Sequence, residues 1–146
     1  MAISKIEQLI AHITELVPVY MADPEDYLRA KGVASVCIID EEGQVFGKIF
    51  GNDKLRGRES FKNAWTKASQ VWITGTKTND YEKMVFNGQV DPKQYGIPLP
   101  ELIGWHGGQP VTLADGTKLA VGFSGFRGSS DLEIVERAME KLSNNC

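Results

Sequence analysis

The sequence predicts a single α+β domain in which helices pack on the faces of a central antiparallel β-sheet. Two pairs of short apolar segments, 33–39 with 45–50 and 111–114 with 117–123, are each joined by turn-forming residues, as in β-hairpins. Segments with helical spacing of apolar residues precede, separate and follow these pairs. A chain of this length can bury about 70% of its unfolded surface in one core, so we interpret residues 1–146 as one domain.

Two helices are predicted before the first hairpin. Apolar residues recur at spacings of three and four over residues 3–17, and we expect Pro18 to end this helix. A shorter helix is expected after Asp23, which would cap it, with Pro24 in its first turn and Gly32 just past its end.

The first hairpin consists of a strand over 33–39, a turn over 40–43 and a strand over 45–50. The first strand is apolar on both faces, which predicts that other elements cover both sides of the sheet. Cys37 lies within this run, and we interpret it as a buried thiol of the core.

A longer helix is predicted over 58–74, where apolar residues line one side. Trp65 and Trp72 are seven residues apart in it, and we expect both to pack in the core or at a subunit interface. A short helix over 78–87 follows, and prolines and glycines predict irregular structure over 92–104.

The last part of the chain contains the second hairpin and a closing helix. Asp115-Gly116 suits the positive φ angles of a tight hairpin turn. Ser130 and Glu133 form a capping-box pattern, which predicts that Ser130 caps a helix running to Leu142.

Charge and composition exclude several classes of partner. The 16 basic and 19 acidic residues give a net charge of −3, so we expect no nucleic acid partner. The basic cluster Lys54, Arg56 and Arg58 is interpreted as a solvated loop. Glu7 interrupts a short N-terminal apolar stretch, so neither a signal peptide nor a membrane span is expected. With no disulfide framework indicated, the predicted location is cytoplasmic.

Several short motifs occur in a characteristic order along the chain. They are the turn over 40–43, a helix with Ala64, Lys67 and Ala68, the turn over 107–110, and the segment 121–125 followed by Asp131 and Ala138. Together they resemble the GlcG/HbpS family of haem-associated proteins, which also supplies the C-terminal domain of PduO-type cobalamin adenosyltransferases. The resemblance spans most of the chain and implies a profilin-like architecture, self-association into homo-oligomers and, as in some relatives, haem or a corrinoid as ligand.

His106 is the first candidate ligand-binding residue. It precedes Gly107 and Gly108, whose flexible backbone could admit a flat ligand, and histidine is a common axial ligand of haem iron. The alternative is a loop histidine that hydrogen-bonds the backbone or an adjoining subunit. Both interpretations stay open.

A second candidate site is the turn that contains Ser124, Gly125, Arg127 and Ser130, where a strand leads into a helix N-terminus. Backbone N–H groups and the helix dipole at such a turn can hold a carboxylate or phosphate. Alternatively, the glycines only shape the turn and Ser130 only caps the helix. Because the second hairpin folds the chain back, we expect His106 and this turn to border one pocket.

Glycines at both candidate sites are expected to include positions of positive φ. The four concerned are Gly107, Gly108, Gly125 and Gly128.

The leading functional hypothesis is a non-catalytic binding module for haem, a corrinoid or a related small anionic ligand, working as a homo-oligomer. An alternative is an enzyme, or an accessory to one, acting on a small organic acid or hydroxy compound, although no set of nucleophile, base and orienting acid is evident. A second alternative is a structural subunit of an oligomer.

Overall fold

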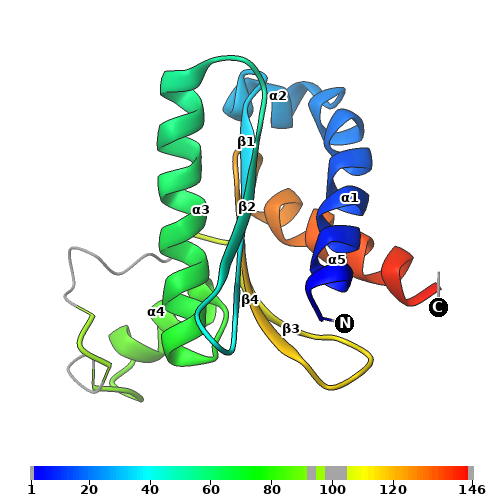
Figure 1. Ribbon diagram of the computed structural model, residues 1–146. Helices are drawn as coiled ribbons and strands as arrows, with labels where there is room; N and C mark the ends of the chain where they lie inside the picture. The colour runs from blue at the N-terminus through cyan, green and yellow to red at the C-terminus, as the bar shows by residue number, and fades with distance from the viewer. Residues whose placement is uncertain (1, 92–94, 98–104, 145–146) are drawn as a thin grey trace.

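Helices and strands occur in the order that the sequence predicts (Figure 1). The computed structural model describes residues 2–91, 95–97 and 105–144. Most of the predicted irregular stretch, 92–104, lies outside the described residues. Within them, the elements are α1 (Ala2–Met21), α2 (Pro24–Ala30), β1 (Ala34–Asp40), β2 (Val45–Phe50), α3 (Lys54–Thr74), α4 (Thr78–Phe86), β3 (Gly108–Thr112), β4 (Lys118–Ser124) and α5 (Gly128–Asn144).

The four strands form one antiparallel sheet in the order β2-β1-β4-β3. Cys37 in the centre of β1 lies opposite Gly47 of β2 on one side and Gly122 of β4 on the other. Both predicted hairpins are confirmed. The second one begins earlier than expected, because the backbone at Gly108 already pairs with Gly122.

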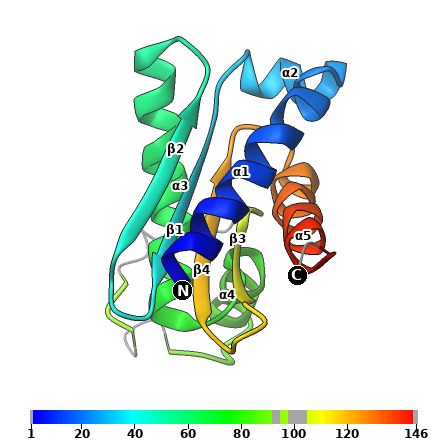
Figure 2. The same cartoon turned by 45° about the vertical axis from the view of Figure 1, so that its right-hand side comes forward.

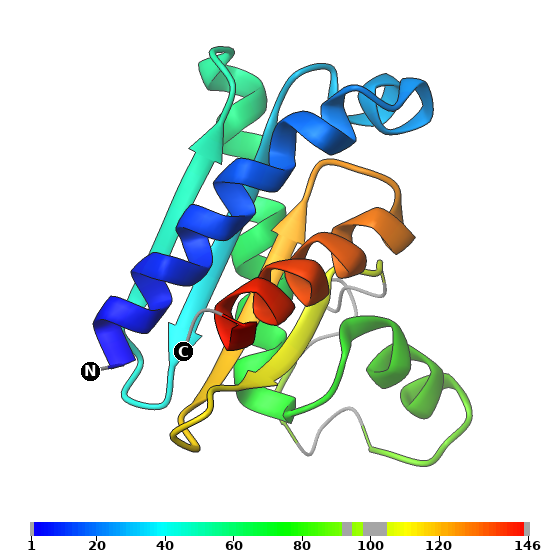
Figure 3. The same ribbon diagram turned by 90° about the vertical axis from the view of Figure 1, so that its right-hand side faces the viewer.

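Helices cover both faces of the sheet, which confirms the prediction from the apolar first strand. Helix α3 lies on one face, and α1 and α5 lie on the other, next to each other (Figures 2 and 3). Successive residues of β1 alternate between the two cores. Val36 and Ile38 join the core under α1 and α5, whereas Cys37 and Ile39 join the core under α3. Cys37 is fully buried, as predicted.

Small residues bring α3 close to the sheet. A Cβ atom at Gly122 would collide with the carbonyl oxygen of Ala64, so this strand position requires glycine. Ala64 and Ala68 form the buried side of the helix together with Val71. Trp65 and Trp72 flank this narrow contact and are each 49% exposed, so neither packs in the core, and their packing at a subunit interface stays a prediction.

Two helix boundaries differ from the predictions. Helix α1 continues through Pro18 to Met21, because Val17 and Tyr20 in this last turn are buried and their burial offsets the lost backbone hydrogen bond. Helix α3 begins at Lys54 rather than at 58. The Asp53 carboxylate caps it by accepting a hydrogen bond from the Arg56 backbone N–H at 3.1 Å.

This earlier start of α3 also corrects the interpretation of the basic cluster. Lys54, Arg56 and Arg58 lie in the first turns of a helix rather than in a loop.

The capping box predicted for the last helix does not form. Helix α5 begins at Gly128, before Ser130, and the Ser130 hydroxyl donates to the Asp26 carboxylate at 2.8 Å. Glu133 accepts a hydrogen bond from the Tyr20 hydroxyl of α1 instead of turning back to the helix start. Both side chains are therefore used to attach α5 to α1 and α2.

Among the described helices, none combines the length and apolar character that crossing a membrane requires.

Candidate functional site

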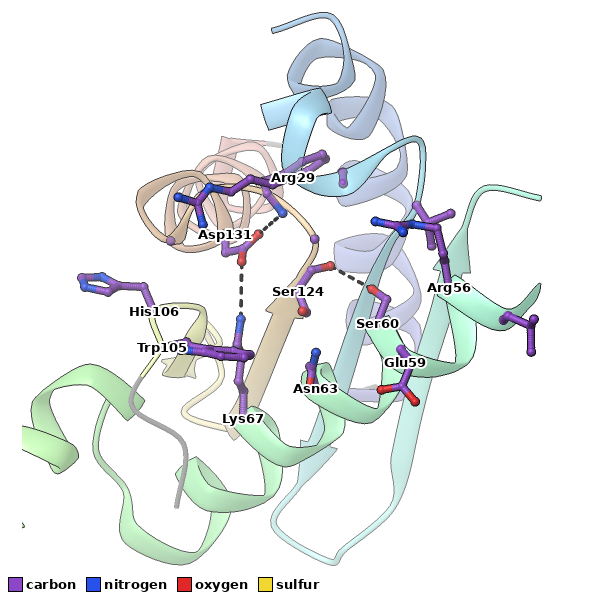
Figure 4. A pocket seen from close by; sticks show the side chains of 16 residues that line it. Arg29, Arg56, Glu59, Ser60, Asn63, Lys67, Trp105, His106, Ser124 and Asp131 are labelled. Atoms are coloured by element: carbon purple, nitrogen blue, oxygen red, sulfur yellow. Dashed lines mark hydrogen bonds and ion pairs between the residues drawn. The ribbon is translucent and has the colours of Figure 1, made fainter. Parts of the chain in front are cut away.

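A cavity of about 780 Å³ opens where β4 leads into α5. Helix α3 forms one wall, and α2 and the residues just before β3 contribute to its sides (Figure 4). Its volume is in the range of ordinary small-molecule sites. Polar side chains account for much of the lining, and the charged or amide-bearing ones are Arg29, Arg56, Glu59, Asn63, Lys67 and Asp131.

One side of α3 supplies the polar wall. Arg56, Ser60, Asn63 and Lys67 follow one another at spacings of three and four, which places them on the same side of the helix. The Ser60 hydroxyl donates to the Ser124 carbonyl oxygen at 3.1 Å and so ties the helix to the end of β4. This stripe lies beside the small residues that contact the sheet.

The floor of the cavity contains a buried ion pair between α3 and α5. The Lys67 ammonium lies 3.4 Å from the Asp131 carboxylate and donates to the Phe123 carbonyl oxygen at 2.9 Å. The other carboxylate oxygen of Asp131 accepts from the Phe126 backbone N–H at 2.9 Å. The side chains of Lys67 and Asp131 are only 2% and 4% exposed. Figure 4 shows the two side chains joined by a dashed line.

Burial dominates the electrostatics of this pair. It raises the pKa of Asp131 to about 7, although Lys67 and the Phe126 N–H favour the ionised carboxylate. Burial also lowers the pKa of Lys67, and the neighbouring Asp131 carboxylate offsets part of this shift. The cavity thus holds a carboxyl group that changes its protonation state near neutral pH.

Thr78, the first residue of α4, positions the chain that bears His106. Its hydroxyl donates to the Trp105 carbonyl oxygen at 2.6 Å and accepts from the Gly108 N–H at 3.3 Å. Gly107 between them has φ +123°, and a Cβ atom there would lie 2.8 Å from the Lys67 ammonium. The residues before β3 therefore pass directly over the ion pair.

We expected positive φ angles among four glycines, and two of the four have a positive φ. These are Gly107 at +123° and Gly125 at +143°. Gly108 and Gly128 are needed for space instead, because a Cβ atom would lie 2.5 Å from the Thr78 methyl carbon and 2.9 Å from the His106 Cβ, respectively.

Of the seven candidate ligand residues, the structure brings three to this cavity: His106, Ser124 and Gly125. Gly128 of the same turn also lines it. His106 is exposed at the edge and contacts Gly128. Its imidazole points away from Ser60 and Asn63 in Figure 4. The hairpin therefore places His106 beside the turn, although 18 residues separate it from Ser124 along the chain.

Gly107, Gly108, Arg127 and Ser130 lie outside the lining of the cavity. Arg127 binds acidic side chains of the α2 segment: Asp26 at 3.1 Å, Glu25 at 2.7 Å and Asp23 at 3.4 Å. Ser130 hydrogen-bonds Asp26 as well. The Arg127 guanidinium is thus occupied by protein carboxylates.

The sequence-derived candidate set missed Arg29, Arg56, Glu59, Asn63, Lys67 and Asp131. One usable signal was present, because Lys67 falls between Ala64 and Ala68 on the otherwise apolar side of its helix. A lysine at such a position must find a buried partner. Within the described ranges, no cluster of three or more His, Cys, Asp or Glu residues is arranged to hold a metal ion.

This arrangement is the α+β fold of the GlcG/HbpS type, as the resemblance implied. Among solved structures, ORFY of Klebsiella pneumoniae, assigned to DUF336, is 18% identical, with a TM-score of 0.67 over 98% of this chain and 90% of its own. The PduOC:haem complex is 18% identical, with a TM-score of 0.66 over 96% of this chain and 93% of its own. HbpS is 18% identical, with a TM-score of 0.58 over 93% of this chain and 87% of its own. No family model and no curated protein sequence matches the chain.

Proposed function

We propose that the protein is a non-catalytic binding module for a small anionic ligand, and that haem is the first ligand to test. The observation that carries the proposal is the open cavity of about 780 Å³ with the cations Arg29 and Arg56 on its walls and Lys67 at its floor. A similar fold in complex with haem supports the choice of ligand.

The residues around the cavity fit the needs of haem, which are an iron ligand, an apolar surface for the ring and partners for the propionates. His106 would offer an imidazole nitrogen from the edge, and the indole of Trp105, 66% exposed, would offer ring surface. Arg29 and Arg56 would pair with propionates. Bound haem would supply an iron centre, and a corrinoid is the alternative flat ligand.

The test is a haem titration followed by absorption spectroscopy. Wild-type protein is expected to bind haem, and His106→Ala is expected to bind it more weakly and with a shifted spectrum. His12→Ala removes the other histidine, which lies on α1 outside this cavity, and serves as the matched control. Unchanged affinity and spectrum in His106→Ala would refute ligation by this residue, and no binding by the wild type would refute haem as the ligand.

One observation favours the alternative of an enzyme acting on a small organic acid or hydroxy compound. Carboxyl groups with a pKa near 7 in a cavity are typical of proton-transfer sites, and Asp131 is such a group. Incubation with a panel of such compounds, followed by NMR, tests this alternative. Turnover by the wild type that is lost in Asp131→Asn would favour the enzyme over the binding module.

Self-association is part of the proposal. Strand β1 is covered on both faces within the chain, so its apolar side chains are not free to form a subunit interface. Large apolar side chains exposed on α3 and on the edge strand β2 support self-association instead. They include Val45, Ile49, Trp65 and Trp72, each between 45% and 52% exposed. Sedimentation at micromolar concentration tests it, and a wild-type monomer would contradict it.

The proposed cytoplasmic location is supported by the free thiol of Cys37.

A further inference from the structure

We propose that Lys67 and Asp131 form the recognition site for a carboxylate at the floor of the cavity, and that the pair takes up one proton when the carboxylate binds. This inference rests on the proposed function and names the ligand group that the site selects. It starts from the position of the pair, which lines the cavity although both side chains are almost wholly buried.

The Lys67 ammonium has bonding capacity to spare. An ammonium group carries three N–H donors. In the described part of the chain, one donates to Phe123 and one faces Asp131 at 3.4 Å, a long distance for a charged pair. The third is available to a ligand oxygen that enters the cavity. A carboxylate suits this position because it brings both a negative charge and a hydrogen-bond acceptor.

A carboxylate placed here adds a negative charge next to Asp131. Two neighbouring carboxylates in a buried site cannot both stay ionised without a large cost, so one of them gains a proton. Because burial already raises the pKa of Asp131 to about 7, this carboxyl group is the one that responds. The ligand anion also favours the charged form of Lys67, whose pKa burial lowers, so the proton goes to Asp131 rather than to Lys67. Above about pH 7, binding therefore takes up a proton.

Other charged groups border the pair from each packed element. Asp26 of α2 raises the pKa of Asp131 further, and Arg29 of the same helix lines the cavity. Glu59 and Arg56 come from α3, and His106 comes from the residues before β3. Arg29, Arg56 and Glu59 are exposed to solvent, which screens their effect on Asp131.

The first experiment uses the unmodified protein. Calorimetric titrations with acetate, haem and haem dimethyl ester at pH 8, in two buffers of different ionisation enthalpy, measure the protons taken up on binding. We expect uptake of up to one proton, with an affinity that falls by up to tenfold per pH unit above about pH 7. Uptake with acetate identifies a free small acid as the source of the carboxylate. Uptake with haem but not with its ester identifies a propionate.

The second experiment assigns the proton. Asp131→Asn keeps the shape of the side chain and should abolish both proton uptake and the pH dependence of affinity. Glu59→Gln is the matched control, because it removes a carboxylate from the same cavity at an exposed position. It should leave proton uptake unchanged.

The outcomes separate this inference from the proposed function. If at least one of the three probes binds but none of them causes proton uptake, the carboxylate site is overturned and the binding module still stands. Uptake that persists in Asp131→Asn also overturns it, and its loss in Glu59→Gln would assign the proton to Glu59. If none of the three probes binds, both the proposed function and this inference fail.

Discussion

Two ion-pair clusters flank the turn that leads from β4 into α5. On one side, the buried carboxylate of Asp26 accepts from the backbone N–H and the Nε of Arg127 and from the Ser130 hydroxyl. On the other side, the buried carboxylate of Asp131 accepts one backbone N–H and lies near one ammonium. Both carboxylates are almost fully buried, yet they differ in how many donors they have.

The number of hydrogen-bond donors decides the protonation state of each of the two carboxyl groups. Burial acts to raise the pKa of Asp26, but the hydrogen bonds from Arg127 and Ser130 outweigh it and hold the pKa below its usual value. For Asp131, burial outweighs the few donors, and the pKa rises to about 7. The carboxylate with many donors within the chain stays ionised, whereas the one with few donors beside the cavity gains a proton more easily.

The largest expected effect follows from removing the cation on the cavity side. Lys67→Met leaves the buried Asp131 carboxylate without its cationic partner, which typically costs about 3–5 kcal/mol in unfolding free energy. We expect this loss at pH 8 and a smaller one at pH 5, where Asp131 becomes protonated. Urea unfolding at both pH values measures it. Lys62→Met, an exposed position on the same helix, is the control, and an equal loss in both variants would contradict the comparison.

A second prediction concerns the opposite pH dependence of the two acids. The folded-state pKa of Asp131 lies above the ordinary value of 3.8, so its contribution to stability is complete below about pH 4 and is lost as the pH rises through 7. The folded-state pKa of Asp26 lies below 3.8, so its contribution is present above that value and is lost as the pH falls.

Urea unfolding between pH 3 and 8 checks this prediction. The wild type should lose stability relative to Asp131→Asn between about pH 4 and 7. Asp26→Asn should cost about 2 kcal/mol at pH 7, the scale of hydrogen bonds to a charged group, and less below pH 4. Parallel pH profiles for the two variants would show that the acids do not differ.

The smallest effect is expected from Arg127. Its side chain is 37% exposed, and the backbone N–H of residue 127 would still bind Asp26 in Arg127→Ala. We expect only a small loss in stability and less than a twofold change in haem affinity. Arg29→Ala is the matched control within the cavity and should weaken haem binding by about fivefold or more. An equal effect of both substitutions on affinity would show that Arg127 also serves the ligand.

Local patterns predicted most of the architecture. The apolar run around Cys37 predicted cover on both faces of the sheet, and Asp115-Gly116 predicted the second hairpin, because each depends on neighbours in the sequence. The hairpin also indicated that His106 and Ser124 would lie together. The Lys67 and Asp131 pair was not predicted as a site, since 64 residues separate the two and only packing of α3 against β4 and α5 brings them together.

Tertiary contacts also explain the wrong assignments. Ser130 and Glu133 match a capping box locally, but Asp26 and Tyr20 offer them stronger partners from distant segments. Pro18 would end an isolated helix, but the buried side chains around it extend α1. Of the two places predicted for Trp65 and Trp72, only the core is wrong, because the contact of α3 with the sheet accepts only small side chains there.

Chemical labelling of the Cys37 thiol can report how often helix α3 separates from the sheet. The thiol lies at the centre of the sheet under α3, and burial raises its pKa to about 12. Alkylating reagents react with the thiolate, so they can modify this sulfur only after α3 has separated from the sheet. The rate at which Cys37 is labelled under native conditions therefore measures how often α3 leaves the sheet. Because the same helix carries the polar wall of the cavity, a ligand bound there should slow that labelling.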